Sequence, residues 1–244
     1  YNAESAMSSM ETVLISSASA TQRSGRAGRV APGSCFRLYS RGVHASMAER
    51  PTPEIQRTAL EATCLQTAAM TESGIQRFLS RALDPPSEDT VMYAVDRLTK
   101  LGAIQTIESG EKLTALGRTI SNLPIDPAIA RMLLLGCVTK CLDPVLTAAA
   151  SYSSRDPFYT PPGMRDEARA IRKSFHDSSD LLSVCRAWDQ CNDLFNNRDY
   201  DTARRWGSDN FISIAGMSNL TSVRSQLLSD LVKLGFVSER DCEG

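Results

Sequence analysis

No lysine precedes Lys100 in this chain of 244 residues, and long apolar runs are also missing. No stretch approaches the ~18 apolar residues of a membrane span and no secretory signal is visible, so we expect no membrane partner. No Gly-x-x-x-x-Gly-Lys-Ser/Thr string occurs, so the chain lacks the loop that cradles nucleotide phosphates in many NTPases. The formal net charge of −1 argues against a general polyanion-binding surface, and nucleic-acid contacts would have to come from local patches.

Paired cysteines are absent as well, because the seven cysteines are scattered and none belongs to a Cys-x-x-Cys string. Cys137 and Cys141 are one helical turn apart, but no histidine or second cysteine pair follows to complete a zinc site. We therefore expect reduced thiols, no bound metal and an intracellular location. The chain opens at Tyr1 without a methionine and soon reads as a buried strand, which predicts a fragment whose sheet partners lie elsewhere.

What the chain does have is a dense arginine string near its start. Gln22–Arg29 reads Gln-Arg-Ser-Gly-Arg-Ala-Gly-Arg, after a β-branched run at Thr12–Ile15 that predicts a buried strand. Guanidinium groups keep their charge and offer a planar fork of donors, which suits phosphate oxygens. Motor proteins driven by NTP place arginine fingers in loops of this kind. A solvated basic loop is the alternative, and the full string of eight residues makes it the weaker one.

These eight residues resemble the sixth conserved motif of the DEAH-box (RHA-type) RNA helicases of superfamily 2. The resemblance implies that the motif belongs to the second RecA-like lobe. It further implies that Arg26 and Arg29 are arginine fingers on the γ-phosphate of ATP and that Gln22 helps to place the attacking water. ATP and Mg²⁺ would be held mainly by a first RecA-like lobe outside this chain, which has no Asp-Glu-Ala-His string.

The sequence predicts a mainly α fold in three parts: the tail of an α/β domain (residues 1–50), a winged-helix domain (51–122) and a helical bundle (123–244). The resemblance implies that the first is the end of a RecA-like lobe and that the last is a ratchet-like domain. In the first part, a second strand is predicted at Ser34–Tyr39. Two strands do not make a stable sheet alone, so we expect them to be incomplete or held by a partner.

The winged-helix prediction rests on helices followed by a hairpin. Thr52 as N-cap and Pro53 predict a helix that runs to about Ala69, and Ser87 and Gly102 bound a later one. A shorter helix is expected at 78–83, and strands at 103–107 and 112–113 flank the turn signal at 108–111. Leu101-Gly102-Ala103 matches the family. Acidic residues offset the basic ones on the helix before Gly102, so we favour a packing module over a DNA-reading domain.

From Thr114 onward the pattern is helical almost throughout. The expected helices are 115–123, 127–139, 144–152, 164–175, 180–195, 199–206 and 217–234, with Gly235 ending the last. Asp126-Pro127 and Asp143-Pro144 read as N-cap-plus-proline starts. The apolar run Leu133–Leu135 predicts that its helix is central to the bundle. Leu123–Pro127 resembles the start of the family's ratchet domain.

The RNA contacts are expected in this last part. Ser154 and Arg155 stand in a loop between helices, and the resemblance implies that the 3′ segment of a single-stranded RNA lies against this domain. Arg155 is the leading candidate contact. A second basic group could share one helical face, and we interpret it as a solvated face balanced by Asp166 and Glu167. Its members are Arg165, Arg169, Arg172 and Lys173.

Two functional hypotheses follow. The first is a segment of an ATP-dependent RNA helicase that remodels or unwinds RNA or ribonucleoprotein, with glycine-rich-patch activators or ribonucleoprotein components as possible partners. The second is a non-catalytic scaffold derived from a helicase. Leu181 stands where the family commonly has a histidine, and Asp189–Cys191 lacks the usual glycine and tryptophan, which favours the scaffold. The intact arginine string favours the motor.

Overall fold

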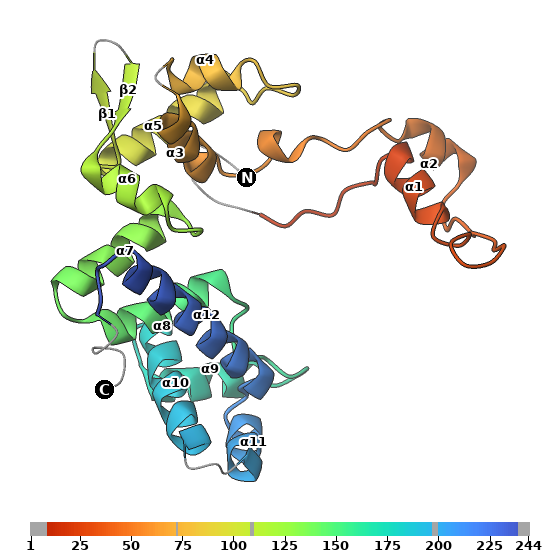
Figure 1. The fold of residues 1–244 in the computed structure, drawn as a ribbon. Helices are drawn as coiled ribbons and strands as arrows, with labels where there is room; N and C mark the ends of the chain where they lie inside the picture. The colour runs from red at the N-terminus through yellow and green to blue at the C-terminus, as the bar shows by residue number, and fades with distance from the viewer. Residues whose placement is uncertain (1–8, 72, 108–109, 197–199, 239–244) are drawn as a thin grey trace. The chain divides into compact units, whose positions relative to one another are not determined.

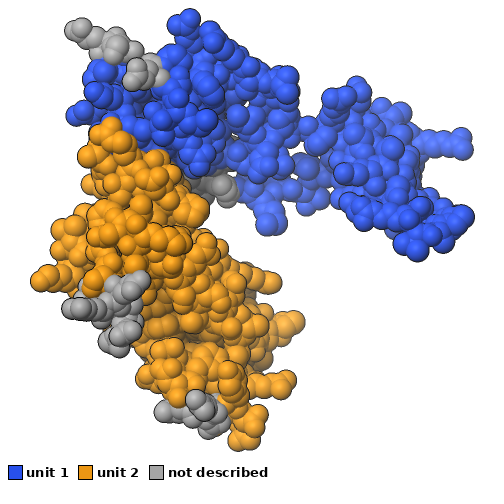
Figure 2. Space-filling model, in the orientation of Figure 1, with its two compact units in different colours: residues 1–114 blue, residues 115–244 orange. Residues whose placement is uncertain are grey.

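The structure is a computed structural model that describes residues 9–71, 73–107, 110–196 and 200–238. The chain forms two compact units, residues 1–114 and residues 115–244 (Figure 2). The described part is mainly helical, with one two-stranded hairpin followed by a helical bundle, which confirms the predicted fold class. The domain boundaries expected after residues 50 and 122 stay predictions.

The first fifty residues contain two short helices, α1 (Ser17–Ser24) and α2 (Arg41–Ser46). The hydroxyl of Ser16 accepts a hydrogen bond from the backbone N–H of Ser19 and so caps α1. The segment after α2 returns to the start of α1, where the N–H groups of Ser17 and Ala18 donate to the carbonyl oxygens of Ala48 and Glu49.

The strands predicted at Thr12–Ile15 and Ser34–Tyr39 were wrong, because neither segment forms a ladder with any described residue. Their apolar side chains are left in solvent: Leu14 is 66% exposed and Phe36 is 87% exposed. A strand needs a hydrogen-bonded neighbour, and short alternating runs cannot supply one by themselves. Both segments instead line one open hollow of about 380 Å³.

The rest of this unit is a small helical core with a hairpin (Figure 1). The elements are the 3₁₀ turn η1 (Glu54–Gln56), α3 (Glu61–Met70), α4 (Ile75–Leu79), α5 (Glu88–Lys100), β1 (Ile104–Ile107) and β2 (Gly110–Leu113). Helices α3, α4 and α5 pack on one another, and the antiparallel hairpin packs on α3 and α5. The side chains of Leu60, Ile75, Leu98 and Ile104 are buried. Helices followed by a two-stranded wing are what the sequence predicted here.

Two helix boundaries in this unit differ from the prediction. The helix expected from Thr52 to Ala69 is broken between η1 and α3, where the Thr58 hydroxyl donates to the Glu54 carbonyl oxygen and competes with a continuing helix. Helix α4 starts and ends earlier than expected, and at its start the N–H of Ile75 donates to the carboxylate of Glu111 on β2. The caps at Ser87 and Gly102 are confirmed.

The second unit is a bundle of helices. In chain order they are α6 (Ala115–Ser121), α7 (Pro127–Val138), α8 (Leu142–Ser153), α9 (Arg165–Phe175), α10 (Asp180–Asn196), α11 (Tyr200–Asp209) and α12 (Ile214–Lys233). Asp126 caps α7 as expected. Helix α12 starts before the predicted Met217 because Ser213 caps it, and Gly235 follows its end with a φ of 76°.

Helix α8 occupies the centre of this bundle, in contact with α7, α10 and α12 (Figure 1). The prediction that the helix of Leu133–Leu135 is central was wrong, since Leu135 and Val138 on α7 are exposed. Small side chains on α8, such as the fully buried Ala149 and Ala150, let three neighbours approach it. Asp143 is not the cap of α8 as predicted; it lies in the first turn and pairs with Arg224.

The pH dependence of stability gives a test of α10. Partial desolvation of the exposed Asp189 side chain, and next the negative charge of Asp143, raise the pKa of Asp189 above its ordinary value. The ionised carboxylate therefore destabilises the folded state above that raised pKa, and the penalty disappears as the pH falls below the ordinary pKa. Asp189→Asn should raise Tm at pH 7, on the order of a degree, and leave Tm unchanged near pH 3. Thermal unfolding of both proteins at the two pH values measures this, and an equal gain at both would contradict it.

Candidate functional site

The arginine turn, defined here as residues Gln22–Arg29, begins on the last turn of α1 and continues past its end. The N–H of Gly25 donates to the carbonyl oxygen of Thr21, and the N–H of Arg26 donates to that of Arg23, so the backbone stays wound beyond Ser24. A Cβ on Gly33 would lie 2.3 Å from the carbonyl oxygen of Ala27, so only glycine lets the returning chain pass there. The returning chain therefore packs closely against the turn at Ala27.

The side chains of Gln22, Arg26 and Arg29 are all exposed. None of them makes a side-chain hydrogen bond or an ion pair within the part of the chain that the structure describes. Space around the turn is open, because a Cβ on Gly28 would meet nothing within 4 Å. Two unpaired guanidinium groups beside an amide in open space can accept an anion from outside, and phosphate oxygens match their geometry.

Of the two predicted cofactors, ATP suits the arginine turn and magnesium does not. Exposed arginines suit the terminal phosphate of ATP, but a magnesium ion needs oxygen ligands such as carboxylates. Within residues 9–71, 73–107, 110–196 and 200–238 there is no group of three or more His, Cys, Asp or Glu side chains that could hold a metal ion.

Among those same residues, no helix is both long and apolar enough to cross a membrane.

The predicted RNA-contact residues lie in the second unit, where α8 ends. The Ser154 hydroxyl donates to the carbonyl oxygen of Ala150 at 2.7 Å, so its single proton is not available for a hydrogen bond to a ligand. Arg155 is exposed and has no side-chain partner in the described residues. Of the two, Arg155 is therefore the one whose donors are available to a ligand.

Arg172 holds the loop that follows. Its guanidinium is 2.5 Å from a carboxylate oxygen of Asp156 and 3.1 Å from one of Asp180, and it lies 4.9 Å from the centre of the Phe158 ring. Our interpretation of Arg172 as part of a solvated face was therefore wrong, whereas Arg165, Arg169 and Lys173 are exposed. Helical spacing placed Arg172 with them, but its partners come from distant segments.

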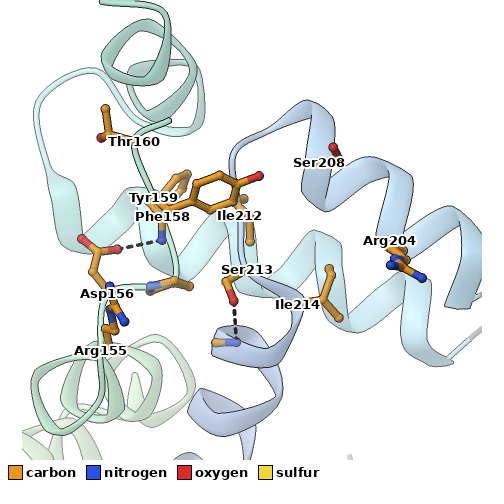
Figure 3. Close-up of a pocket in the computed structure, with 12 residues that line it drawn as sticks. Arg155, Asp156, Phe158, Tyr159, Thr160, Arg204, Ser208, Ile212, Ser213 and Ile214 are labelled. Carbon is orange, nitrogen blue, oxygen red and sulfur yellow. Dashed lines mark hydrogen bonds between the residues drawn. The ribbon is translucent and has the colours of Figure 1, made fainter. Parts of the chain in front are cut away.

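The loop 155–160 is joined to the turn between α11 and α12. Phe158 and Ile212 form an antiparallel bridge, the N–H of Tyr159 donates to the carbonyl oxygen of Phe211, and the N–H of Ser213 donates to that of Pro157. A hollow of about 710 Å³ lies along this junction. Figure 3 shows Arg155 and Arg204 on opposite sides of Tyr159 and Ser213.

Sequence reasoning missed Arg204 and Tyr159 as members of this hollow. Arg204 lies on α11 and Tyr159 follows α8, and no local pattern relates positions so far apart. The only sequence signal was the pair Arg204-Arg205 on a polar helix, which does not tell which of the two faces a groove.

Comparison with known proteins adds independent information. Residues 94–125 match the winged-helix part of the helicase-associated domain (HA2), and residues 126–185 match its ratchet-like part. The chain is 39% identical over 226 residues to the DExH-box ATP-dependent RNA helicase DExH3 of Arabidopsis thaliana, covering 91% of the chain and 18% of the relative. It is 38% identical over 244 residues to the human ATP-dependent DNA/RNA helicase DHX36, covering 99% of the chain and 24% of the relative. The chain thus spans about a quarter or less of the length of these relatives.

Proposed function

This chain belongs to the DEAH-box helicases and carries their winged-helix and ratchet-like helicase-associated domains, and we propose that the protein uses ATP hydrolysis to unwind or remodel RNA or ribonucleoprotein. The single observation that carries the proposal is the arginine turn, which exposes Arg26 and Arg29 without an internal partner. The alternative, a solvated basic loop, would also leave these arginines exposed, so the rate of ATP hydrolysis has to decide between the two.

The chemistry of the turn follows from the charge that develops during phosphoryl transfer. Negative charge spreads over the transferred group, and a fixed guanidinium stabilises it more in the transition state than in the bound nucleotide. Arg26 and Arg29 would supply that charge, and the Gln22 amide would orient the attacking water. Magnesium, when bound by other parts of the protein, neutralises the phosphate oxygens.

The RNA would be contacted in the ratchet-like domain. Arg155 would bind a backbone phosphate of the 3′ single strand. Ser154 would contribute only by accepting a hydrogen bond from a ribose 2′-OH, because its own proton is donated to Ala150. Activators with glycine-rich patches and ribonucleoprotein components remain proposed partners.

The test is the rate of ATP hydrolysis by the full-length protein, with and without single-stranded RNA. RNA-stimulated hydrolysis that depends on Arg26 and Arg29 supports the motor. A protein that binds RNA but hydrolyses no ATP above background would instead be the non-catalytic scaffold, the alternative that the changed residues at Leu181 and Cys191 favour.

A further inference from the structure

We infer that the hollow along the 155–160 loop is a nucleic-acid subsite in which Arg155 and Arg204 bind backbone phosphates and the ring of Tyr159 stacks on a base. The inference rests on the proposed function, because it takes RNA as the ligand. The inference goes beyond the proposed function because it assigns Arg204 and Tyr159 to the RNA site and states the role of each residue.

The charge lining the hollow is positive. Asp156 is the only carboxylate among its lining residues, and it is already paired with Arg172 while it accepts the N–H of Phe158. Arg155 and Arg204 are exposed and have no side-chain partner in the described residues. Their placement on opposite sides of Tyr159 (Figure 3) suits a polymer with repeated charges better than one small anion.

The aromatic ring favours RNA over an acidic peptide. Tyr159 is 44% exposed, and one side of its ring is held by an edge contact with Phe211, whose ring centre is 6.1 Å away. A ring that is already oriented loses little entropy when a base stacks on it, and stacking platforms between cationic residues are how proteins hold single strands. An acidic peptide offers carboxylates to the arginines but no flat partner for the ring.

The subsite is built before any ligand arrives. Arg172 fixes the loop through Asp156, and the bridge between Phe158 and Ile212 joins the loop to the start of α12. On the other side, a Cβ on Gly207 would lie 2.9 Å from the carbonyl oxygen of Ile212, so the turn packs closely on α11. These contacts keep Arg204 and Tyr159 on one surface of the bundle.

The experiment measures binding of a fluorescently labelled 12-nucleotide oligouridylate to the 244-residue chain, by anisotropy without nucleotide, at several salt concentrations. Arg204→Ala should weaken binding several-fold and reduce the slope of log K against log salt by about 0.7, the loss of one phosphate contact. The matched control is Arg205→Ala, which removes an exposed neighbour on α11 that does not line the hollow. Equal effects of the two variants would overturn the subsite.

A second pair of variants tests the ring. Tyr159→Leu should weaken binding by about tenfold, the loss of one stacked base, and Tyr159→Phe should bind as the parent does. Thermal unfolding checks that each variant is folded. Binding of a polyglutamate peptide in place of the RNA, or no RNA binding at all, would refute the subsite. Neither result bears on the arginine turn, because that test reads ATP hydrolysis.

Discussion

Arg26→Ala, or Arg29→Ala, in the full-length protein should lower kcat for ATP hydrolysis on the order of 10³-fold, which is the scale of the effect of an arginine finger. Both side chains are exposed and unpaired in the described residues, so their removal breaks no side-chain hydrogen bond or ion pair among those residues. The loss should therefore appear in kcat and leave Tm unchanged. Steady-state hydrolysis with saturating RNA and thermal unfolding of each variant measure the two quantities.

Two comparisons sharpen this test. Arg26→Lys keeps the charge but not the planar fork, so hydrolysis should remain well below the level of the parent protein. Arg41→Ala removes an exposed arginine at the start of α2, outside the arginine turn, and should leave hydrolysis near the level of the parent protein. Turnover close to the parent level in Arg26→Ala and Arg29→Ala would remove the basis for assigning these residues to the γ-phosphate.

Of the proposed variants, Arg224→Ala should lower the free energy of unfolding most. The loss should be about 2–4 kcal/mol, because charged hydrogen bonds and a cation–π contact are lost together. The Arg224 side chain on α12 is 14% exposed and lies 4.0 Å from the centre of the Trp188 ring on α10. It also donates at 2.6 Å to the Asp143 carbonyl oxygen and to the Thr147 hydroxyl, and pairs with the Asp143 carboxylate. One side chain thus joins three helices of the bundle.

Denaturant unfolding of the 244-residue chain measures this loss. Lys233→Ala is the matched control, because Lys233 lies on the same helix, its side chain is 71% exposed, and its one ion pair among the described residues, with Asp230, is worth about 0.5 kcal/mol or less. The loss of unfolding free energy in Arg224→Lys should lie between those of Arg224→Ala and Lys233→Ala, since lysine keeps the charge but cannot reach all three partners at once. If Arg224→Ala cost no more than Lys233→Ala, the contacts of Arg224 would be irrelevant to folding.

The other structural predictions succeeded at several helix ends, where their physical basis lies within a few residues, and failed elsewhere for different reasons. Caps at Ser87 and Asp126 and the turn after Gly235 were predictable, because each depends on a side chain or a backbone freedom within a few residues. The strand at Thr12–Ile15 was predicted wrongly because a strand needs a distant hydrogen-bonding partner. The continuous helix from Thr52 was predicted wrongly because the Thr58 hydroxyl binds a backbone carbonyl oxygen at the break. The role predicted for α7 failed for another reason: apolar residues on several sides of a helix do not show that every side is covered, since Leu135 and Val138 are exposed.

By itself, the sequence determined the arginine turn, the order of winged helix and bundle, and the likeness to DEAH-box helicases, since these depend on residue type at short spacing. Only the tertiary structure decided that Arg172 is tied to Asp156 and that Arg224 joins three helices. The same holds for Arg204, which shares a hollow with Arg155 and Tyr159. The physical reason is that a charged side chain takes its role from whatever carboxylate, ring or open space the packed chain brings to it, and packing joins segments that no local pattern connects.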